Sequence, residues 1–595
     1  MKIRHVRIRN FRAIRSLDWS IDARFAVLIG SGDAGKSTVL DALALAVSLR
    51  WNPPLSDADF HRGDTASPVV IEVTLTEPPA ALVREDRYGH WLRGIASDGS
   101  LHREPDSDHE MALTVRLTVD SSLEPVWEVI RASDEDGVRI GAADRGRLGV
   151  FRLSDAGSAH LRWSRDSALT RLGEAGEVNE ALLQAHRAAR AAVFATPPEG
   201  LAKSATAAGE AIEAIGGARL TQPRPGLDPT AGQRAGSLLL HDGDVPTTFL
   251  GLGSQRLAGI AFQLEALDEH SVALIDEVEI GLEPHRLRHL VRHLKRREAA
   301  GAGQVIVTTH SPVVVEEVEV TDLNIVRRDA EHTSVLPVPK AIEGLGADEP
   351  QATARGGAAA LLARRIVVCE GPTEVGLCRA LVDHWDKSEA TPAALIGTVH
   401  RNGHGNSAPT KAECLATLGY AVALLSDHDL SRREQAVYER RLAAARRSGV
   451  LHLTWDRGAA TEDQIARSLP VDAVRQLIAL AVELNESDDP EMSVRAAVAA
   501  RLGDGTGRLE GLDPVEWCRQ ARASPPAVRA AIGAAARSRG WFKSETRGSR
   551  LGALVAPALP ALQETDPLRA TLDRLRRFVY GHREPECTHE GAPVG

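Results

Sequence analysis

A glycine-rich segment at residues 30–37, Gly-Ser-Gly-Asp-Ala-Gly-Lys-Ser, constrains the fold of this chain more than any other feature. It follows a wholly apolar run at residues 25–29, and helical spacing of apolar residues begins at residue 38. Strand, loop and helix in this order form the setting in which backbone N–H groups and a helix N-terminus hold phosphates. We therefore predict that ATP binds here, contacted by Gly30, Gly32, Gly35, Lys36, Ser37 and Thr38.

Two later apolar runs end on polar residues that would complete a nucleotide site. One run leads directly to Asp276 and Glu277, and another, at residues 305–307, leads through two threonines to His310. We predict that Asp276 and Ser37 hold Mg²⁺ and that Glu277 orients or deprotonates the attacking water. His310 would sense the terminal phosphate.

The composition is typical of a globular protein with more than one domain. A chain of 595 residues predicts about two to four domains. The net charge of -10 argues against a uniformly basic nucleic-acid coat but leaves room for local grooves. The five cysteines form no CxxC pair, which favours a reducing compartment over a disulfide framework. No apolar run approaches about 18 residues and no signal core is visible, so we expect a cytoplasmic protein without a membrane span.

The order of these motifs resembles an ABC-type ATPase head of the kind found in chromosome-maintenance and recombination proteins, and residues 6–12 resemble its first strand. The resemblance implies paired heads, with a signature segment of one completing the site of the other. The candidate signature is residues 250–256, where Gly251 replaces the usual serine. We therefore expect a nucleotide switch more than a fast motor. The β-rich runs at 69–75 and 111–119 are expected to extend the ATPase sheet.

The middle of the chain leaves alternatives open. Residues 166–216 predict a helical insertion, either a dimerisation arm or a plain helical cap. Residues 221–247 are rich in proline and glycine and predict a loop. The basic stretch at 283–297 is either a solvated helix face or a nucleic-acid track.

A second set of acidic residues follows a glycine- and alanine-rich joint at 356–360. A strand-like run ends at Glu370 and Gly371, and Glu374 follows one helical turn later. A further apolar run at 421–426 ends in Asp427, His428 and Asp429. Clustered carboxylate oxygens of this kind suit hard divalent cations.

This order of elements resembles the TOPRIM fold of topoisomerases, primases and certain nucleases. In it, a strand ends in Glu-Gly, a helix follows, and a later strand ends in Asp-x-Asp. An ABC-type head followed by TOPRIM resembles the OLD (overcoming lysogenization defect) family of nucleases, whose relatives include the nuclease of the Gabija phage-defence system. The resemblance implies a two-metal DNA nuclease using Mg²⁺, or Mn²⁺ in its place. By analogy the metal ligands would be Glu370, Glu374, Asp427, Asp429 and Glu462.

The same resemblance implies a late lysine that neutralises transition-state charge, and Lys543 is the candidate. The loop at 403–406 is expected near the substrate, with His404 or His428 as alternative metal ligands. Arginine clusters flank this region, and one or two of them are expected to line a DNA groove. They lie at 432–433, 440–441, 446–447 and 569–577.

The predicted fold is α/β: an ABC-type P-loop ATPase domain with a helical insertion, followed by a TOPRIM α/β domain with helical additions. The predicted boundaries are 1–165 and 217–350 for the ATPase halves, 166–216 for the insertion, 361–584 for TOPRIM and 585–595 for a disordered tail.

The predicted function is an ATP-binding, metal-dependent DNA endonuclease, with bacterial anti-phage defence as its setting. The alternative is an ATP-driven DNA-binding or repair protein with a non-cleaving TOPRIM domain. Glu370 would be catalytic in the first case. Expected partners are DNA, a second copy in a homodimer or higher oligomer, and a separately encoded helicase or reverse transcriptase, with no membrane.

Overall fold

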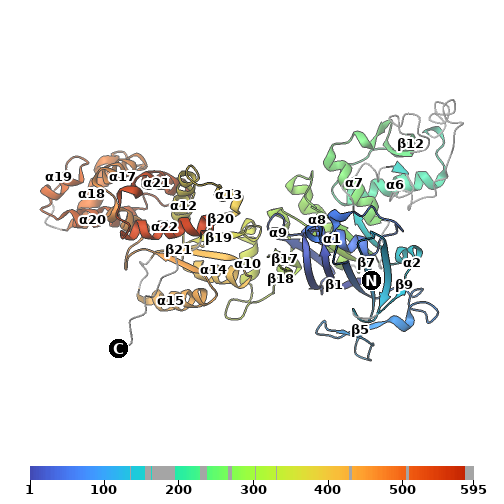
Figure 1. Cartoon of the computed structure of the whole chain (residues 1–595). Coiled ribbons are helices and arrows are strands. Elements are labelled where there is room, and N and C mark those ends of the chain that lie inside the picture. The colour runs from blue at the N-terminus through green and yellow to red at the C-terminus, as the bar shows by residue number, and fades with distance from the viewer. Residues whose placement is uncertain are drawn as a thin grey trace, which may run out of the picture. The chain divides into compact units, whose positions relative to one another are not determined.

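The computed structural model describes most of the chain as two compact units, residues Met1–Lys340 and Ala341–Gly595. The described residues are 1–133, 136–153, 162–163, 194–227, 238–265, 271–299, 301, 303–329, 331–427, 432–503 and 508–582. Figure 1 draws the first unit in blue to green and the second in yellow to red. His428, Asp429, residues 166–193 of the predicted insertion and the predicted tail at 585–595 lie outside the described residues.

The P-loop strand lies inside a parallel sheet. Its strand order is β10-β15-β16-β3-β17-β18, with only β18 antiparallel to its neighbour. All five residues of β3 are buried, as the apolar run at 25–29 predicts. The strands are β3 (Phe25–Ile29), β10 (Val150–Leu153), β15 (Val272–Ile275), β16 (Gln304–Thr308), β17 (Leu323–Arg328) and β18 (Thr333–Pro337).

The β-rich runs at 69–75 and 111–119 belong to a different, antiparallel sheet, so the expectation that they extend the P-loop sheet is wrong. They form β4 and β7, which pair with each other, and β4 also pairs with β1. The strands are β1 (Lys2–Phe11), β2 (Ile14–Ser20), β4 (Val69–Thr76), β5 (Arg93–Ile95), β6 (Leu101–His102), β7 (Glu110–Val119), β8 (Pro125–Ile130) and β9 (Val138–Arg139).

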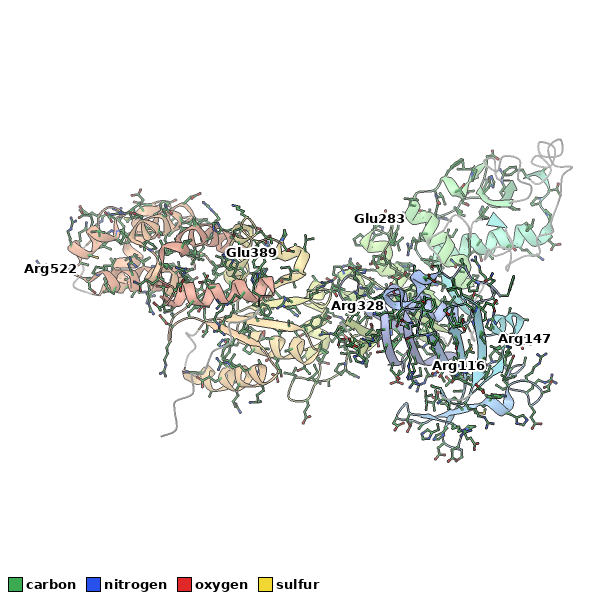
Figure 2. The ribbon with its side chains drawn as sticks, viewed as in Figure 1. Arg116, Arg147, Glu283, Arg328, Glu389 and Arg522 are labelled. Atoms are coloured by element: carbon green, nitrogen blue, oxygen red, sulfur yellow. The ribbon has the colours of Figure 1, made fainter. Side chains whose placement is uncertain are left out.

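Helix α1 (Lys36–Ala46) lies in the core shared by these two sheets. Val39 and Leu43 of the helix are fully buried with Val73 and Val115 of the antiparallel sheet and Leu274 of β15. In the antiparallel sheet, Arg116 of β7 pairs with Glu128 of the neighbouring β8 at 2.7 Å, and Figure 2 labels this arginine. The loop that precedes α1 is therefore held by packing on two sides.

The segment at 221–247 is not simply a loop. It contributes strands to a small antiparallel sheet of β11 (Arg162–Trp163), β12 (Pro223–Leu227), β13 (Leu238–Asp242) and β14 (Val245–Pro246). Strand β12 is at the sheet edge, where proline and glycine are tolerated because one row of N–H groups is unused. The other helices of the unit are α2 (Ala142–Arg147), α6 (Glu199–Ala214), α7 (Leu252–Glu265), α8 (Pro284–Ala299) and α9 (Pro312–Glu317).

The second unit is built on a parallel sheet of order β20-β19-β21-β22. Its strands are β19 (Arg365–Cys369), β20 (Thr398–Asn402), β21 (Ala421–Ser426) and β22 (Leu451–Thr454). Its helices are α10 (Glu349–Arg355), α11 (Ala358–Leu361), α12 (Pro372–Trp385), α13 (Ala393–Ile396), α14 (Ala408–Thr417), α15 (Arg432–Arg447), α16 (Thr461–Ser468), α17 (Val471–Glu483), α18 (Pro490–Leu502), α19 (Pro514–Gln520), α20 (Pro525–Arg539), α21 (Glu545–Ala558) and α22 (Pro567–Tyr580).

Helix α12, which follows the Glu-Gly motif, packs closely on α21 through glycines. A Cβ built on Gly376 would lie 2.0 Å from the Glu545 carbonyl oxygen, and one on Gly548 would lie 2.3 Å from the Thr373 carbonyl oxygen. Beyond the end of α12, Glu389 (labelled in Figure 2) pairs with Arg576 of α22 at 2.7 Å. The glycine contacts hold the N-terminal part of α12 against α21, and the ion pair holds the segment after α12 against α22.

Across the described ranges, no helix combines the length and the apolar character needed to cross a bilayer.

Candidate nucleotide site and carboxylate cluster

The glycine-rich loop depends on glycine for its backbone conformation at two positions. Gly30 (φ 141°) and Gly35 (φ 96°) adopt positive φ values, and a Cβ on Gly30 would lie 2.4 Å from the Val326 carbonyl oxygen. The Lys36 side chain is buried, and its ammonium donates to the carbonyl oxygens of Gly30 (3.0 Å) and Ser31 (2.8 Å). Burial lowers the pKa of Lys36 to about 8, although nearby carboxylates oppose the shift.

Asp276 joins the ends of several elements at this loop. Its Oδ1 accepts from the hydroxyls of Ser37 (3.0 Å) and Thr308 (2.5 Å), and its Oδ2 accepts from Arg152 (2.9 Å). The structure thus brings together the two residues predicted to hold Mg²⁺, from the start of α1 and the end of β15. Arg152 also pairs with Asp41 of α1. Arg152 and Thr308 belong to no recognisable sequence motif, so their contacts with Asp276 were not predicted.

Glu277 has a strained backbone. Its φ is 43°, in the left-handed region that non-glycine residues seldom adopt. Its N–H donates to the Thr308 hydroxyl (2.8 Å), and its carbonyl oxygen accepts from Arg256 (2.8 Å). Two hydrogen bonds therefore hold the predicted water-orienting residue in this conformation. His310 is exposed just beyond the end of β16, and its N–H donates to Glu279 (2.5 Å).

The segment predicted as a signature begins helix α7. A Cβ on Gly253 would lie 2.1 Å from the Gly281 carbonyl oxygen, so this glycine permits close approach to the segment after Glu277. Ser254 accepts a hydrogen bond from Arg286 (3.1 Å). Leu252 is 81% exposed at the start of the helix.

The basic helix α8 uses much of its charge within the unit. Arg288 pairs with Glu316, Arg292 with Glu317, and Lys295 with Asp322. Of the two interpretations of residues 283–297, these ion pairs favour a helix face neutralised locally over a nucleic-acid track.

In the second unit the predicted acidic residues gather at the ends of β19 and β21. Glu370 directly follows β19 and accepts the N–H of Asp427 at 2.8 Å, while Asp427 directly follows β21. Glu374, in the first turn of α12, accepts the N–H of Gly371 at 2.9 Å. The sequence pattern of two apolar strands, each leading to a carboxylate, thus corresponds to one edge of one sheet.

Thr461, at the start of α16, links this group and was not anticipated. Its hydroxyl lies 2.8 Å from Glu374 Oε1 and 2.9 Å from Asp427 Oδ1, and it accepts from Trp455 Nε1 (2.9 Å). A hydroxyl has a single proton, so it satisfies only one of the two carboxylates at a time. Glu462, the next residue, is 9% exposed.

Burial and the neighbouring carboxylates raise the pKa values of Asp427 and Glu462. The pKa of Asp427 lies well above its usual range because of burial and the charges of Glu374, Glu370 and Glu462. Burial, with Glu374 and Asp463 adding to it, raises the pKa of Glu462 to about 7. Asp427 also lines a cavity of about 190 Å³ with Tyr438, His452 and Arg457.

The carboxylates of Glu370, Glu374 and Asp427 are linked through the Thr461 hydroxyl and through backbone amides. They do not surround a common position for a metal ion. Within the ranges that the structure describes, no three His, Cys, Asp or Glu side chains form a ready-made metal site. Asp429 and His428, two of the predicted candidates, fall outside those ranges.

Lys543 and His404 belong to segments that adjoin the elements of the cluster. Lys543 is exposed just before α21, and the carbonyl oxygen of its neighbour Phe542 accepts from Thr373 (3.1 Å), the residue before Glu374. His404 is exposed in the loop after β20, and its backbone is left-handed (φ 61°).

Comparisons with known proteins bear on the first unit. A family model described as "AAA ATPase domain" matches residues 1–67, and one described as "AAA domain, putative AbiEii toxin, Type IV TA system" matches residues 231–316. The first range contains the glycine-rich loop and the second contains Asp276, Glu277 and His310. The first unit therefore carries an ATPase domain of the AAA type. A search of curated proteins finds no match.

Among solved structures, the SMC head domain from Thermotoga maritima is 14% identical, and the match covers 57% of this chain and 100% of that one. Its TM-score is 0.29.

Proposed function

We propose that this protein is an ATP-binding, metal-dependent DNA endonuclease of the OLD type, with a TOPRIM-like site in the second unit that nucleotide at the first unit regulates. The observation that supports it most is the convergence of Glu370, Glu374 and Asp427 at one sheet edge, two of them on the single hydroxyl of Thr461. A carboxylate such as Asp427, whose pKa is raised by burial and by neighbouring carboxylates, is characteristic of functional sites.

The donor set fits Mg²⁺ or Mn²⁺, because it consists of carboxylate oxygens alone and because burial together with these carboxylates raises the pKa of Asp427. Glu370, Glu374, Asp427 and Glu462 would hold the cation, with Asp429 as a further ligand. When bound, such a cation supplies Lewis acidity and an activated water for in-line displacement at phosphorus.

The chain's own residues orient this site. The Gly371 N–H fixes one oxygen of Glu374, and Trp455 with the Thr461 N–H fixes Asp427. Lys543 would lie beside the phosphate and neutralise charge that develops on it in the transition state.

Nucleotide would act through the first unit. Lys36 would exchange the carbonyl oxygens of its own loop for the outer phosphates, and Ser37 with Asp276 would hold Mg²⁺. Leu252, exposed at the start of α7, suits contact with a second copy, so we propose a homodimer of heads or a higher oligomer. A cytoplasmic role in bacterial anti-phage defence, with a separate helicase or reverse transcriptase, rests on the family resemblance alone.

Two observations favour the alternative, an ATP-driven DNA-binding or repair protein that does not cut. Both family models lie within the first unit, and no ready-made metal group occurs among the described residues.

Plasmid cleavage separates the two proposals. Wild-type protein with Mg²⁺ or Mn²⁺ is expected to nick or cut supercoiled plasmid, and Glu370→Ala is expected to abolish this. Glu516→Ala, which removes an exposed carboxylate on α19, serves as the matched control. Cleavage by neither wild type nor variant favours the alternative, and equal cleavage by wild type and Glu370→Ala excludes the proposed site.

A further inference from the structure

The loop between β20 and α14 lies directly against Glu370. The Gly403 N–H donates to the Cys369 carbonyl oxygen (2.6 Å), and the Gly405 N–H donates to that of Glu370 (2.7 Å). A Cβ on Gly403 would lie 2.3 Å from Ala408 Cβ, so the loop packs closely against the start of α14. A ligand bound by this loop would therefore lie next to the carboxylate cluster.

Cations gather around this loop. Lys411, in the first turns of α14, donates from Nζ to the Gly403 carbonyl oxygen at 3.1 Å. Arg441 of α15 is exposed and donates to the hydroxyl of Thr410 at 3.0 Å. His404 is exposed in the loop itself. Burial, then Lys411 and then Arg401, lowers the pKa of His404, so these groups are close enough to interact electrostatically.

Arg401, a fourth cation near the loop, is buried without a hydrogen bond to any described residue. It is 6% exposed, and the residues described provide no hydrogen-bond partner for any of its three guanidinium nitrogens. Its Nε lies against the backbone of Gly357, where a Cβ would come within 2.5 Å. Burying an unpaired charge is costly, and an anion on the surface above Arg401 would reduce the cost through its field, without touching the guanidinium.

Acidic side chains around the loop only partly balance this charge. Glu349 of α10 acts electrostatically on both Arg401 and Lys411, and its carboxylate accepts a hydrogen bond from Thr353 (3.1 Å). Glu413 of α14 lies near Arg441 and Arg447, and burial raises its pKa against their effect. On the side of the loop that faces α14 and α15, the charges of Arg401, Lys411, Arg441 and Arg447 outnumber these two carboxylates, while the Glu370 cluster supplies the negative charge on the other side.

We propose that His404, Lys411 and Arg441, which we call the loop cations, bind a backbone phosphate of DNA beside the phosphodiester that meets the Glu370 cluster, while the buried Arg401 adds positive potential behind them. This inference rests on the proposed function and specifies which surface of the second unit holds the strand. A cationic group next to an acidic cluster lets an acidic protein attract DNA locally, because phosphate contacts depend on where charges lie.

The salt dependence of DNA binding tests this. A fluorescently labelled duplex oligonucleotide is titrated with the full-length chain in EDTA, which prevents cutting, at a series of KCl concentrations. Lys411→Gln and Arg441→Gln each remove one charge from the loop cations. Arg519→Gln removes one exposed charge from α19, at the other end of the unit from α14 (Figure 1).

Each loop variant is expected to reduce the slope of log K against log salt by about 0.9, the value for one lost phosphate contact on duplex DNA. Arg519→Gln is expected to match wild type. Slopes for Lys411→Gln and Arg441→Gln that equal the Arg519→Gln slope overturn the inference, even if wild type cuts plasmid. Reduced slopes in a protein that never cuts plasmid support the phosphate site and overturn only the proposed nuclease activity.

Discussion

Replacing Gly376 by alanine tests the close packing that sets α12, and with it Glu374, against the C-terminal helices. The new Cβ would lie 2.0 Å from the Glu545 carbonyl oxygen and 2.6 Å from the Ser549 nitrogen. Ordinary contact needs about 3.5 Å. Both atoms belong to the backbone of α21, so no side-chain rotation relieves the overlap and the helices must move apart.

The expected loss of stability follows from two opposing effects. Overpacking costs about 1–3 kcal/mol, and a clash with immobile backbone belongs at the upper end. Alanine in place of glycine returns about 1 kcal/mol of helix propensity. The free energy of unfolding of the second unit should therefore fall by about 2 kcal/mol.

Hydrogen exchange measures this loss within the unit concerned. Amides of α12 and α21 should exchange about 30-fold faster in Gly376→Ala than in wild type. Gly200, in helix α6, has open space within 4 Å of the point where a Cβ would lie, so Gly200→Ala should leave its own unit unchanged or slightly more stable. Unchanged protection of α12 and α21 in Gly376→Ala would refute the packing argument.

Three further predictions concern the two sites. Lys36→Met should weaken ATP binding at least tenfold in calorimetry, because its ammonium would hold the outer phosphates; wild-type affinity would contradict this. Burial raises the pKa of Glu462 to about 7, so the folded, metal-free protein keeps a proton that the unfolded chain loses above its usual value of 4.5. Stability should fall by about 3 kcal/mol as pH rises through that window. Glu462→Gln should remove this contribution while that of Asp427 remains, and urea midpoints at pH 5 and pH 8 in EDTA measure the difference; identical pH dependence in both proteins would argue against it. Lys543→Ala should slow plasmid cleavage by about 10²–10³-fold while DNA binding in EDTA changes little, and unaltered cleavage would remove the lysine from the mechanism.

Motifs with fixed spacing and a fixed setting could be predicted from the sequence. The apolar run before Gly30 and the helical spacing after Lys36 specify strand, loop and helix locally, and the structure has them. The two carboxylates at strand ends, Glu370 and Asp427, could be placed at one sheet edge because parallel strands share the edge at which they end.

Residues that act through long-range contacts could not be predicted. Thr308 and Thr461 are single hydroxyls whose importance depends on which strand or helix end lies opposite. The residues of β4 show that the segment is a strand but not which sheet it joins, because pairing partners are set by tertiary contacts. Strand β12 was missed because its proline and glycine suggest a loop and are tolerated only at an edge.

The central claim is that the carboxylate cluster of the second unit holds a divalent cation for phosphodiester chemistry. Calorimetric titration of Mn²⁺ into the full-length chain without nucleotide tests it most directly. Wild type and Lys36→Met should bind Mn²⁺ equally, since the nucleotide loop is not involved, and Asp427→Asn should abolish binding. Mn²⁺ binding that survives in Asp427→Asn, or no binding by the wild type, would contradict the account.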